Sequence, residues 1–463
     1  MSGLFKVPVR RQQVLLFVVD LALLLLSLML AFVIARFAKF NILFVLDRFT
    51  VACIIYFTTY ALVFYIGQLY EVESRFEEIR SFLYICGLVI AANLIISMFY
   101  YFLPSWRIAR RVMAIQAPIA AILIYLWRKA FVLVSRGLVS ARKVLILGRV
   151  EEGASLIEEL RAGAGPDFAL AGVLDDRPPG GDLGGVPVLG RTGELREIVS
   201  RHGIDIIVFT GNPGSDRDLV RGVLEMKASG LRVYELATFY KTVTGKVPVR
   251  YIEDRWLLFS QDFTGIAGGD ARNLKRLIDV IIAGGSLVVL SPLMALIALM
   301  VKATSRGPIL YRQERVGLDK KSYSLLKFRT MRVDAEKEGT PVWASENDRR
   351  VTPIGGFLRS LRLDELPQFV NVLKGEMSVI GPRPERPYFV EQLERDIPYY
   401  SLRYSAKPGL TGWAQVNYPY GASVEDAHTK LQYDLYYIQE TSLFLDLVIL
   451  LKTLQTVLFR PGY

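Results

Sequence analysis

The adjacent carboxylic acids Asp364 and Glu365 are the leading candidates for chemistry in this sequence of 463 residues. They stand just before Pro367, after which apolar residues recur at helical spacing, so we expect Asp364 to lie at a helix N-terminus. Free N–H groups and the helix dipole there favour an anion by roughly 0.3–1 kcal/mol, which predicts an ionised Asp364. A carboxylate can attack phosphorus and form an acyl-phosphate. The same pair is also an ordinary helix-capping sequence, and both interpretations remain open at this point.

Repulsion between Asp364 and Glu365 predicts a divalent cation beside them. Mg²⁺ binds oxygen ligands and commonly takes one or two carboxylates together with substrate phosphates. We therefore expect both residues as metal ligands, with Glu365 binding Mg²⁺ or orienting the pair.

Several cations near the acidic pair could bind phosphate, because a guanidinium grips phosphate in a bidentate fork. Arg359 precedes Asp364 by five residues, and Arg383 stands between two prolines that stiffen its loop. The alternative for each cation is a surface charge near anionic lipid. The candidate substrate-binding residues are Arg359, Arg383, Lys327, Arg329 and Arg350.

Composition narrows the classes of function. The formal net charge is +11, which favours anionic lipid or phosphorylated substrates, and no run of residues is typical of nucleic-acid binding. The chain has two cysteines, both inside apolar runs, and two histidines. This scarcity argues against a disulfide framework, a histidine-rich zinc site or a Ser-His-Asp triad.

The first 140 residues predict a four-helix transmembrane domain. The first apolar run is too long for a signal peptide and predicts a retained helix. The fourth contains Arg128 and Lys129, so it either runs to about residue 135 or ends near Trp127 with these cations at the interface. An even number of spans, with a slight excess of Lys and Arg inside, places both chain ends in the cytoplasm. The expected spans are 14–35, 49–69, 81–103 and 112–135.

Residues 141–262 alternate short apolar strands with helical stretches, which predicts a Rossmann-like α/β domain with a parallel sheet. The expected strands end near Gly148, Leu174 and Thr210. Val150 replaces the middle glycine of a dinucleotide fingerprint, so a spacer or dimerisation module is favoured over nucleotide binding.

A second apolar block runs from Leu277 to Val301 and is interrupted by Ser291 and Pro292. Proline leaves the carbonyl of Val288 without its amide donor, and the Ser291 hydroxyl can serve that carbonyl instead. The block is either a kinked span or a re-entrant helix–break–helix that returns to the same membrane face. Cations flank both ends, which favours re-entry.

The C-terminal region resembles the bacterial sugar transferases, the monotopic polyprenyl-phosphate phosphoglycosyl transferases, over residues 271–463. The sequence departs from the family pattern near Lys320, at Asp348-Arg349-Arg350 and after Asn417. The motifs that carry the resemblance are Lys327-Phe328-Arg329-Thr330-Met331, Asp364-Glu365-Leu366-Pro367-Gln368, Asn371-Val372-Leu373-Lys374-Gly375, Gly381-Pro382-Arg383-Pro384 and Lys407-Pro408-Gly409-Leu410-Thr411-Gly412-Trp413.

The resemblance implies a mainly helical monotopic catalytic domain with a re-entrant helix over 274–302, broken at Ser291-Pro292. It implies an Asp-Glu dyad, Mg²⁺, and ping-pong transfer of hexose-1-phosphate from a UDP-sugar to polyprenyl phosphate through a phosphosugar-Asp364 intermediate. The four spans and the α/β domain match the large form of this family. The resemblance also implies a multi-pass protein of the bacterial inner membrane that forms a homodimer, with its catalytic domain on the cytoplasmic face.

Two other functions compete with this interpretation. A membrane-anchored nucleotide-sugar epimerase or dehydratase would use a Tyr-x-x-x-Lys pair, and Tyr323 and Lys327 have that spacing. A non-catalytic scaffold for polysaccharide assembly would be indifferent to the change Asp364→Asn.

Overall fold

The described residues of the computed structural model fall into two compact units, one within Val9–Ser140 and one within Ala141–Tyr463. Each unit is described by itself. The residues that the structure describes are 11–35, 50–70, 79–102, 108–138, 141–148, 168–175, 182–183, 186–210, 217–252, 256–257, 269–332, 350–418, 421 and 423–459.

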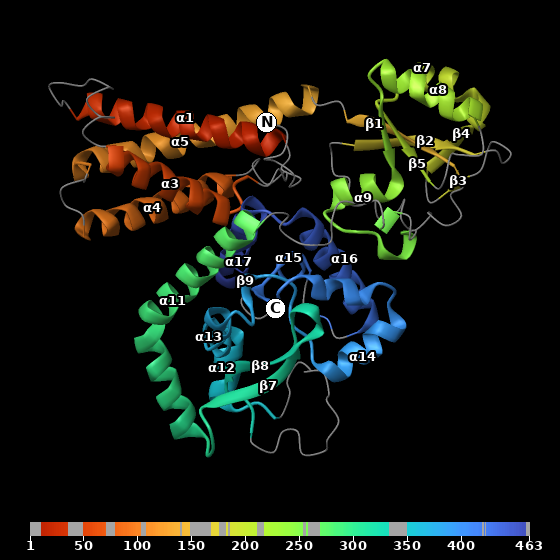
Figure 1. Cartoon of the computed structure of the whole chain (residues 1–463). Helices are drawn as coiled ribbons and strands as arrows, with labels where there is room; N and C mark the ends of the chain where they lie inside the picture. Colours follow the sequence, from red (N-terminus) through yellow and green to blue (C-terminus); the bar gives the residue numbers. More distant parts are fainter. Residues whose placement is uncertain are drawn as a thin grey trace. The chain divides into compact units, whose positions relative to one another are not determined.

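The first unit contains the four apolar helices that the sequence predicts, drawn in red to orange in Figure 1. Three are long and apolar enough to cross a membrane, and α3 is a shorter apolar helix. Helix α5 contacts both α1 and α4, and α3 contacts α4. Their bounds are α1 Arg11–Ile34, α3 Thr50–Ile66, α4 Ile79–Phe102 and α5 Arg110–Leu138.

Helix α5 continues to Leu138, so of the two ends considered for the fourth apolar run the one near Trp127 is not the end of the helix. Arg128 is 1% exposed, and its Nη2 donates a 2.5 Å hydrogen bond to the Asp20 carboxylate of α1. A buried guanidinium needs a compensating charge, and Asp20 supplies it. Asp20 of α1 therefore pairs with a neighbouring helix.

The α/β part of the second unit is built on a six-stranded sheet of order β3-β4-β2-β1-β5-β6. The predicted strands appear, and their pairings are parallel except for the short β3, which runs antiparallel to β4. The rest of the fingerprint after Gly148, including Val150, lies outside the described residues. The strands are β1 Arg142–Leu147, β2 Phe168–Leu174, β3 Asp182–Leu183, β4 Val186–Gly190, β5 Ile206–Phe209 and β6 Arg232–Glu235, and the helices α7 Leu195–His202, α8 Arg217–Ala228 and α9 Leu236–Thr244.

The C-terminal part is mainly helical, with one antiparallel hairpin, β7–β8, and one short parallel pair, β9–β10 (Figure 1). Most of its helices are ten residues long or shorter, and strand β7 is largely exposed. The elements are α11 Gly269–Thr304, β7 Leu310–Val316, β8 Ser322–Phe328, α12 Pro353–Ser360, α13 Gln368–Lys374, β9 Ser378–Ile380, α14 Pro387–Asp396, β10 Gly409–Thr411, α15 Trp413–Asn417, α16 Val424–Glu440 and α17 Leu443–Phe459.

Helix α11 is a single helix of 36 residues that continues through Pro292, where the sequence predicts an interruption. It curves in Figure 1, and the Ser291 hydroxyl donates a 2.8 Å hydrogen bond to the Val288 carbonyl, as expected. The middle of the helix presents large apolar side chains outward, with Val288 and Val289 each 75% exposed. An apolar surface of this kind is unusual on a protein that meets only water.

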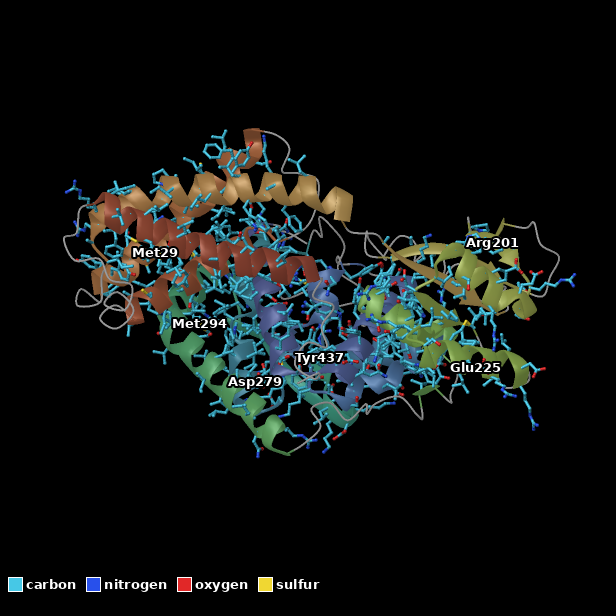
Figure 2. The ribbon with its side chains drawn as sticks, turned by 90° about the horizontal axis from the view of Figure 1, so that it is seen from above. Met29, Arg201, Glu225, Asp279, Met294 and Tyr437 are labelled. Carbon is cyan, nitrogen blue, oxygen red and sulfur yellow. The ribbon has the colours of Figure 1, made fainter. Side chains whose placement is uncertain are left out.

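Both ends of α11 contact the same C-terminal body. Near the start, Asp279 accepts hydrogen bonds from the Ser378 hydroxyl and the Val379 amide, both at 3.0 Å. Near the end, Ile297 and Val301 are buried in one apolar cluster with Phe328, Leu358 and, partly buried, Met294. Asp279 and Met294 are labelled along this helix in Figure 2.

Candidate active site

The acidic pair lies in a 3₁₀ turn, Leu363–Glu365, between α12 and α13. The preceding Arg362 has a φ of 55°, so the chain reverses sharply before the turn. Leu363 and Leu366, on either side of the pair, join the apolar cluster around the C-terminal half of α11. The residues that flank the two carboxylates thus pack in the same apolar cluster as the C-terminal half of this helix.

Glu365 binds two cations through one oxygen. Its Oε1 accepts from Lys327 Nζ at 2.9 Å and from Arg383 Nη2 at 3.0 Å. Burial acts to raise the pKa of the Glu365 carboxyl, but Lys327 and Arg383 outweigh it and hold that pKa well below its ordinary range. Glu365 is thus a fixed anion that brings together a strand residue and a loop residue.

Asp364 is 6% exposed, and its carboxylate accepts no hydrogen bond from the part of the chain described. Burial raises the pKa of the Asp364 carboxyl above its ordinary value, and the negative charge of Glu365 acts in the same direction. The positive charges of Lys327, Arg359 and Arg383 act to lower that pKa. The turn stands ahead of α13, which begins only at Gln368. Desolvation therefore exceeds the helix-end effect expected from the sequence, and the Asp364 carboxylate is poorly solvated.

Arg359 occupies the last turn of α12, and its Nε donates a 2.9 Å hydrogen bond to Oγ1 of Thr330. Thr330 follows strand β8, which carries Lys327, so this bond joins the helix before the turn to the strand behind it. A helix, a strand and a loop thereby aim Arg359, Lys327 and Arg383 at the acidic pair.

Two predicted substrate-binding residues are placed differently. Arg329 is buried, and its Nη2 donates to the carbonyl and the hydroxyl of Ser305, at 2.9 and 2.6 Å, just beyond α11. The backbone carbonyl of Arg350 accepts a 3.0 Å hydrogen bond from the Arg332 amide. The structure gives Arg329 a bracing contact rather than a place beside Glu365.

Residue roles that sequence reasoning missed belong to Asn371 and Thr330. Asn371 is fully buried in α13, where its Oδ1 accepts from the Leu326 amide at 3.0 Å and its Nδ2 donates to the Ser324 carbonyl at 2.8 Å. These bonds fasten α13 to β8 and so fix the turn of the acidic pair against Lys327. Both residues stand in motifs noted above, and a buried amide flanked by apolar residues was the available signal.

Tyr323 and Lys327 lie on strand β8. Four strand residues span about 13 Å, whereas the same spacing on a helix brings two side chains together. Lys327 is already bound to Glu365. The close Tyr–Lys pair that an epimerase or dehydratase would need is therefore not formed by these two residues.

The donor chemistry of the pair fits Mg²⁺. Among the described residues no group of three or more His, Cys, Asp or Glu side chains gathers as a metal site. Mg²⁺ often takes only one or two carboxylates and completes its shell with water and substrate phosphates. Asp364 and the Oε2 of Glu365, which receives no hydrogen bond within the described ranges, would supply such ligands.

Two regions of this chain match models of known protein families. The model of the bacterial sugar transferases matches residues 270–460, and that of a CoA-binding domain matches residues 64–212. The C-terminal match contains the turn, the strand and the loop that meet at Glu365.

Individual relatives extend the likeness. A UDP-N-acetylgalactosamine-undecaprenyl-phosphate N-acetylgalactosaminephosphotransferase of Aeromonas hydrophila is 41% identical over 233 residues, 50% of this chain and 53% of that protein. A UDP-glucose:undecaprenyl-phosphate glucose-1-phosphate transferase of Escherichia coli (strain K12) is 35% identical over 326 residues, 67% of each chain. The alignment thus covers about half of the first relative and two thirds of the second. This chain belongs to the bacterial sugar transferase family.

Proposed function

We propose that this protein transfers hexose-1-phosphate from a UDP-sugar to polyprenyl phosphate, as an initiating step of exopolysaccharide or O-antigen synthesis. The observation that carries the proposal is the convergence of Lys327, Arg359 and Arg383 on the carboxylates Asp364 and Glu365. Phosphoryl-type transfer depends chiefly on positioning and charge neutralisation, which this arrangement supplies. The printed names of the relatives describe the same class of reaction.

In the first step a carboxylate oxygen of Asp364 attacks the phosphorus that bears the sugar. The bond from that phosphorus to the bridging diphosphate oxygen breaks, and UMP leaves with the electron pair. In the second step a phosphate oxygen of polyprenyl phosphate attacks the same phosphorus and the bond to Asp364 breaks. The carboxylate is restored, and the products are UMP and polyprenyl-diphosphate-sugar.

The cations have separate tasks in this proposal. Arg383 and Lys327, fixed by Glu365, neutralise charge on the diphosphate, and Arg359 faces Asp364. Bound Mg²⁺, held by Asp364 and Glu365 with substrate oxygens, would offset charge on the leaving nucleotide.

The experiment measures UMP release from purified protein with Mg²⁺ and a panel of UDP-sugars, with and without undecaprenyl phosphate. Labelled UMP should exchange into the UDP-sugar without lipid, because a covalent intermediate is reversible. Asp364→Asn should abolish both signals, while Glu391→Gln, an exposed carboxylate on α14, should keep them. Release that persists in Asp364→Asn would overturn the nucleophile, and release without exchange would overturn the ping-pong order.

We further propose that α11 is the re-entrant membrane helix of a monotopic catalytic domain on the cytoplasmic face of the bacterial inner membrane. The support is that Asp279 near its start and Val301 near its end both contact one body, while the middle exposes apolar side chains. The domains on this view are 1–140, 141–262 and 271–463, with the re-entrant segment over 274–302.

Cysteine labelling tests this topology. Arg272→Cys and Arg306→Cys, both exposed, are placed at the two ends of α11 in a chain lacking Cys53 and Cys86. An impermeant thiol reagent should label both from the cytoplasmic side, in inside-out vesicles and not in spheroplasts. Labelling of the two ends from opposite sides would establish a crossing helix instead. The homodimer implied by the resemblance is tested by light scattering of the detergent-solubilised protein.

A further inference from the structure

The loop that carries Arg383 is held through four consecutive backbone carbonyls. Pro382 and Pro384 have no amide hydrogen to donate, so the conformation of this loop depends on what its carbonyls accept. The accepted bonds are Gly409 N to Pro382 O at 2.9 Å, Arg403 Nη2 to Arg383 O at 2.9 Å, Arg315 Nη1 to Pro384 O at 3.0 Å and Val316 N to Glu385 O at 3.0 Å.

Arg403 is the charged member of this set that contacts Arg383 itself. It is 5% exposed, and its Nη2 donates at once to the Arg383 carbonyl at 2.9 Å and to Oδ2 of Asp434 at 2.8 Å. Its Nη1 donates to the hydroxyl of Tyr400. One guanidinium nitrogen therefore links a helix carboxylate to the backbone of a residue that binds Glu365.

Asp434 lies on α16 and is 2% exposed, and its carboxylate fixes the orientation of the Arg403 guanidinium. A buried ion pair contributes little net stability compared with well-packed apolar residues, since both charges lose hydration. Its geometric effect is larger, because a planar guanidinium held by a carboxylate has one orientation. That orientation sets the position of the Arg383 backbone.

We propose that Arg403, oriented by Asp434, is a positioning residue that places the guanidinium of Arg383 against Glu365 and the substrate diphosphate. Arg403 acts through the Arg383 carbonyl and does not itself touch the reacting atoms. The inference rests on the proposed sugar-phosphate transfer and adds to it a helix-to-loop support that lies outside the motifs named above.

The decisive experiment is a double-mutant cycle on UMP release. Arg403→Lys keeps the positive charge beside Asp434. A lysine ammonium cannot reproduce the planar guanidinium that donates to the Tyr400 hydroxyl and to the Arg383 carbonyl at once. Misplacement of a positioning group costs on the order of 10- to 100-fold in kcat, and we expect a loss in that range. In an Arg383→Lys background, where the positioned guanidinium is already gone, the added loss should shrink to about twofold or less.

The effects of substitutions at independent sites combine to within about a factor of two. Equal losses of kcat for Arg403→Lys in the two backgrounds would therefore overturn the proposal and leave Arg403 a merely structural residue. Melting temperatures of all variants are measured alongside. Inactive wild-type protein would instead contradict the proposed function, so the two failures are distinguishable.

A second comparison remains decisive even if Arg403→Lys does not fold. Asp434 and Glu440 both lie on α16, and each forms a largely buried ion pair, Asp434 with Arg403 at 2.8 Å and Glu440 with Lys241 at 2.7 Å. Asp434→Asn and Glu440→Gln each remove the carboxylate charge from one of these pairs. We expect Asp434→Asn to lower kcat at least about tenfold per folded molecule, whereas Glu440→Gln keeps the wild-type kcat. Equal kcat values for the two variants would contradict the positioning role.

Discussion

The hydroxyl of Ser291 donates a 2.8 Å hydrogen bond to the carbonyl of Val288, the carbonyl that lies four residues before Pro292. Proline at position 292 has no N–H to offer it, and in hydrocarbon an unsatisfied carbonyl costs several kcal/mol. The residue next to the proline thus repairs the gap that the proline makes. Helix α11 accordingly continues without interruption through its middle.

We predict that Ser291→Ala lowers the free energy of unfolding by about 1–3 kcal/mol, because the Val288 carbonyl loses its donor. Thermal unfolding in nanodiscs provides the measurement. Ser286→Ala on the same helix is the matched control, since no hydrogen bond involves the Ser286 side chain among the residues described. Equal losses in the two variants would show that the Ser291 bond has no special effect.

Removing Lys327 should change the pH dependence of catalysis. The pKa of Asp364 is raised by burial, and Lys327 is the leading charge that opposes the rise. In Lys327→Met that pKa climbs further, so the acid limb of the kcat/KM profile moves to higher pH. We expect kcat/KM to fall roughly 10²-fold at neutral pH and more steeply below it.

The control for that profile is Lys320→Met, which removes an exposed lysine paired with Glu394 and should leave both limbs in place. A Lys327→Met profile that is lower but parallel to the wild type would mean that Lys327 does not govern the protonation of Asp364.

Arg329 should contribute to stability and not to transfer. Arg329→Met removes the hydrogen bonds to the Ser305 carbonyl and hydroxyl, and we expect the free energy of unfolding to fall by roughly 2–3 kcal/mol. kcat/KM per folded molecule should stay near the wild type. Arg383→Met should behave in the opposite way, with a loss of roughly 10²–10³ in kcat/KM. A catalytic loss in Arg329→Met at unchanged melting temperature would restore the substrate-binding role that the sequence suggested.

The junction between the α/β part and the catalytic part can be tested at Gly245, which ends α9 with a φ of 67°. Its carbonyl accepts a 2.9 Å hydrogen bond from Trp413 Nε1, and an added Cβ would lie 3.3 Å from the Trp413 ring. Gly203, which ends α7 with a φ of 61°, has open space around it.

Both Gly→Ala changes incur the left-handed backbone cost of roughly 1–2 kcal/mol, but only Gly245→Ala also presses on Trp413. We therefore expect a larger fall in melting temperature for Gly245→Ala than for Gly203→Ala. Equal falls in melting temperature would indicate that the Trp413 ring moves aside from the added methyl group at no cost in stability.

Features that depend on near neighbours in the chain could be predicted from the sequence. The strands β1, β2 and β5, the four N-terminal apolar helices and the Ser291–Val288 bond all follow from local periodicity or from helix geometry over three or four residues. The acidic pair was identified in the same way, from residue types and motif order.

Only the tertiary structure decided which charges meet. Lys327 is 38 residues from Glu365, Arg383 is 18 residues away, and Arg128 is 108 residues from Asp20. Nothing in local geometry distinguishes Lys327 from Arg329, two positions along, yet one binds Glu365 and the other Ser305.

The direction of the Asp364 pKa likewise required the folded chain. A helix N-terminus, read from sequence, favours the charged form, whereas burial opposes it, and burial exists only after distant segments have come together. The sequence by itself determined the residues capable of the chemistry and their local conformation. The tertiary structure decided their partners and their hydration, because both arise from contacts between segments far apart in the chain.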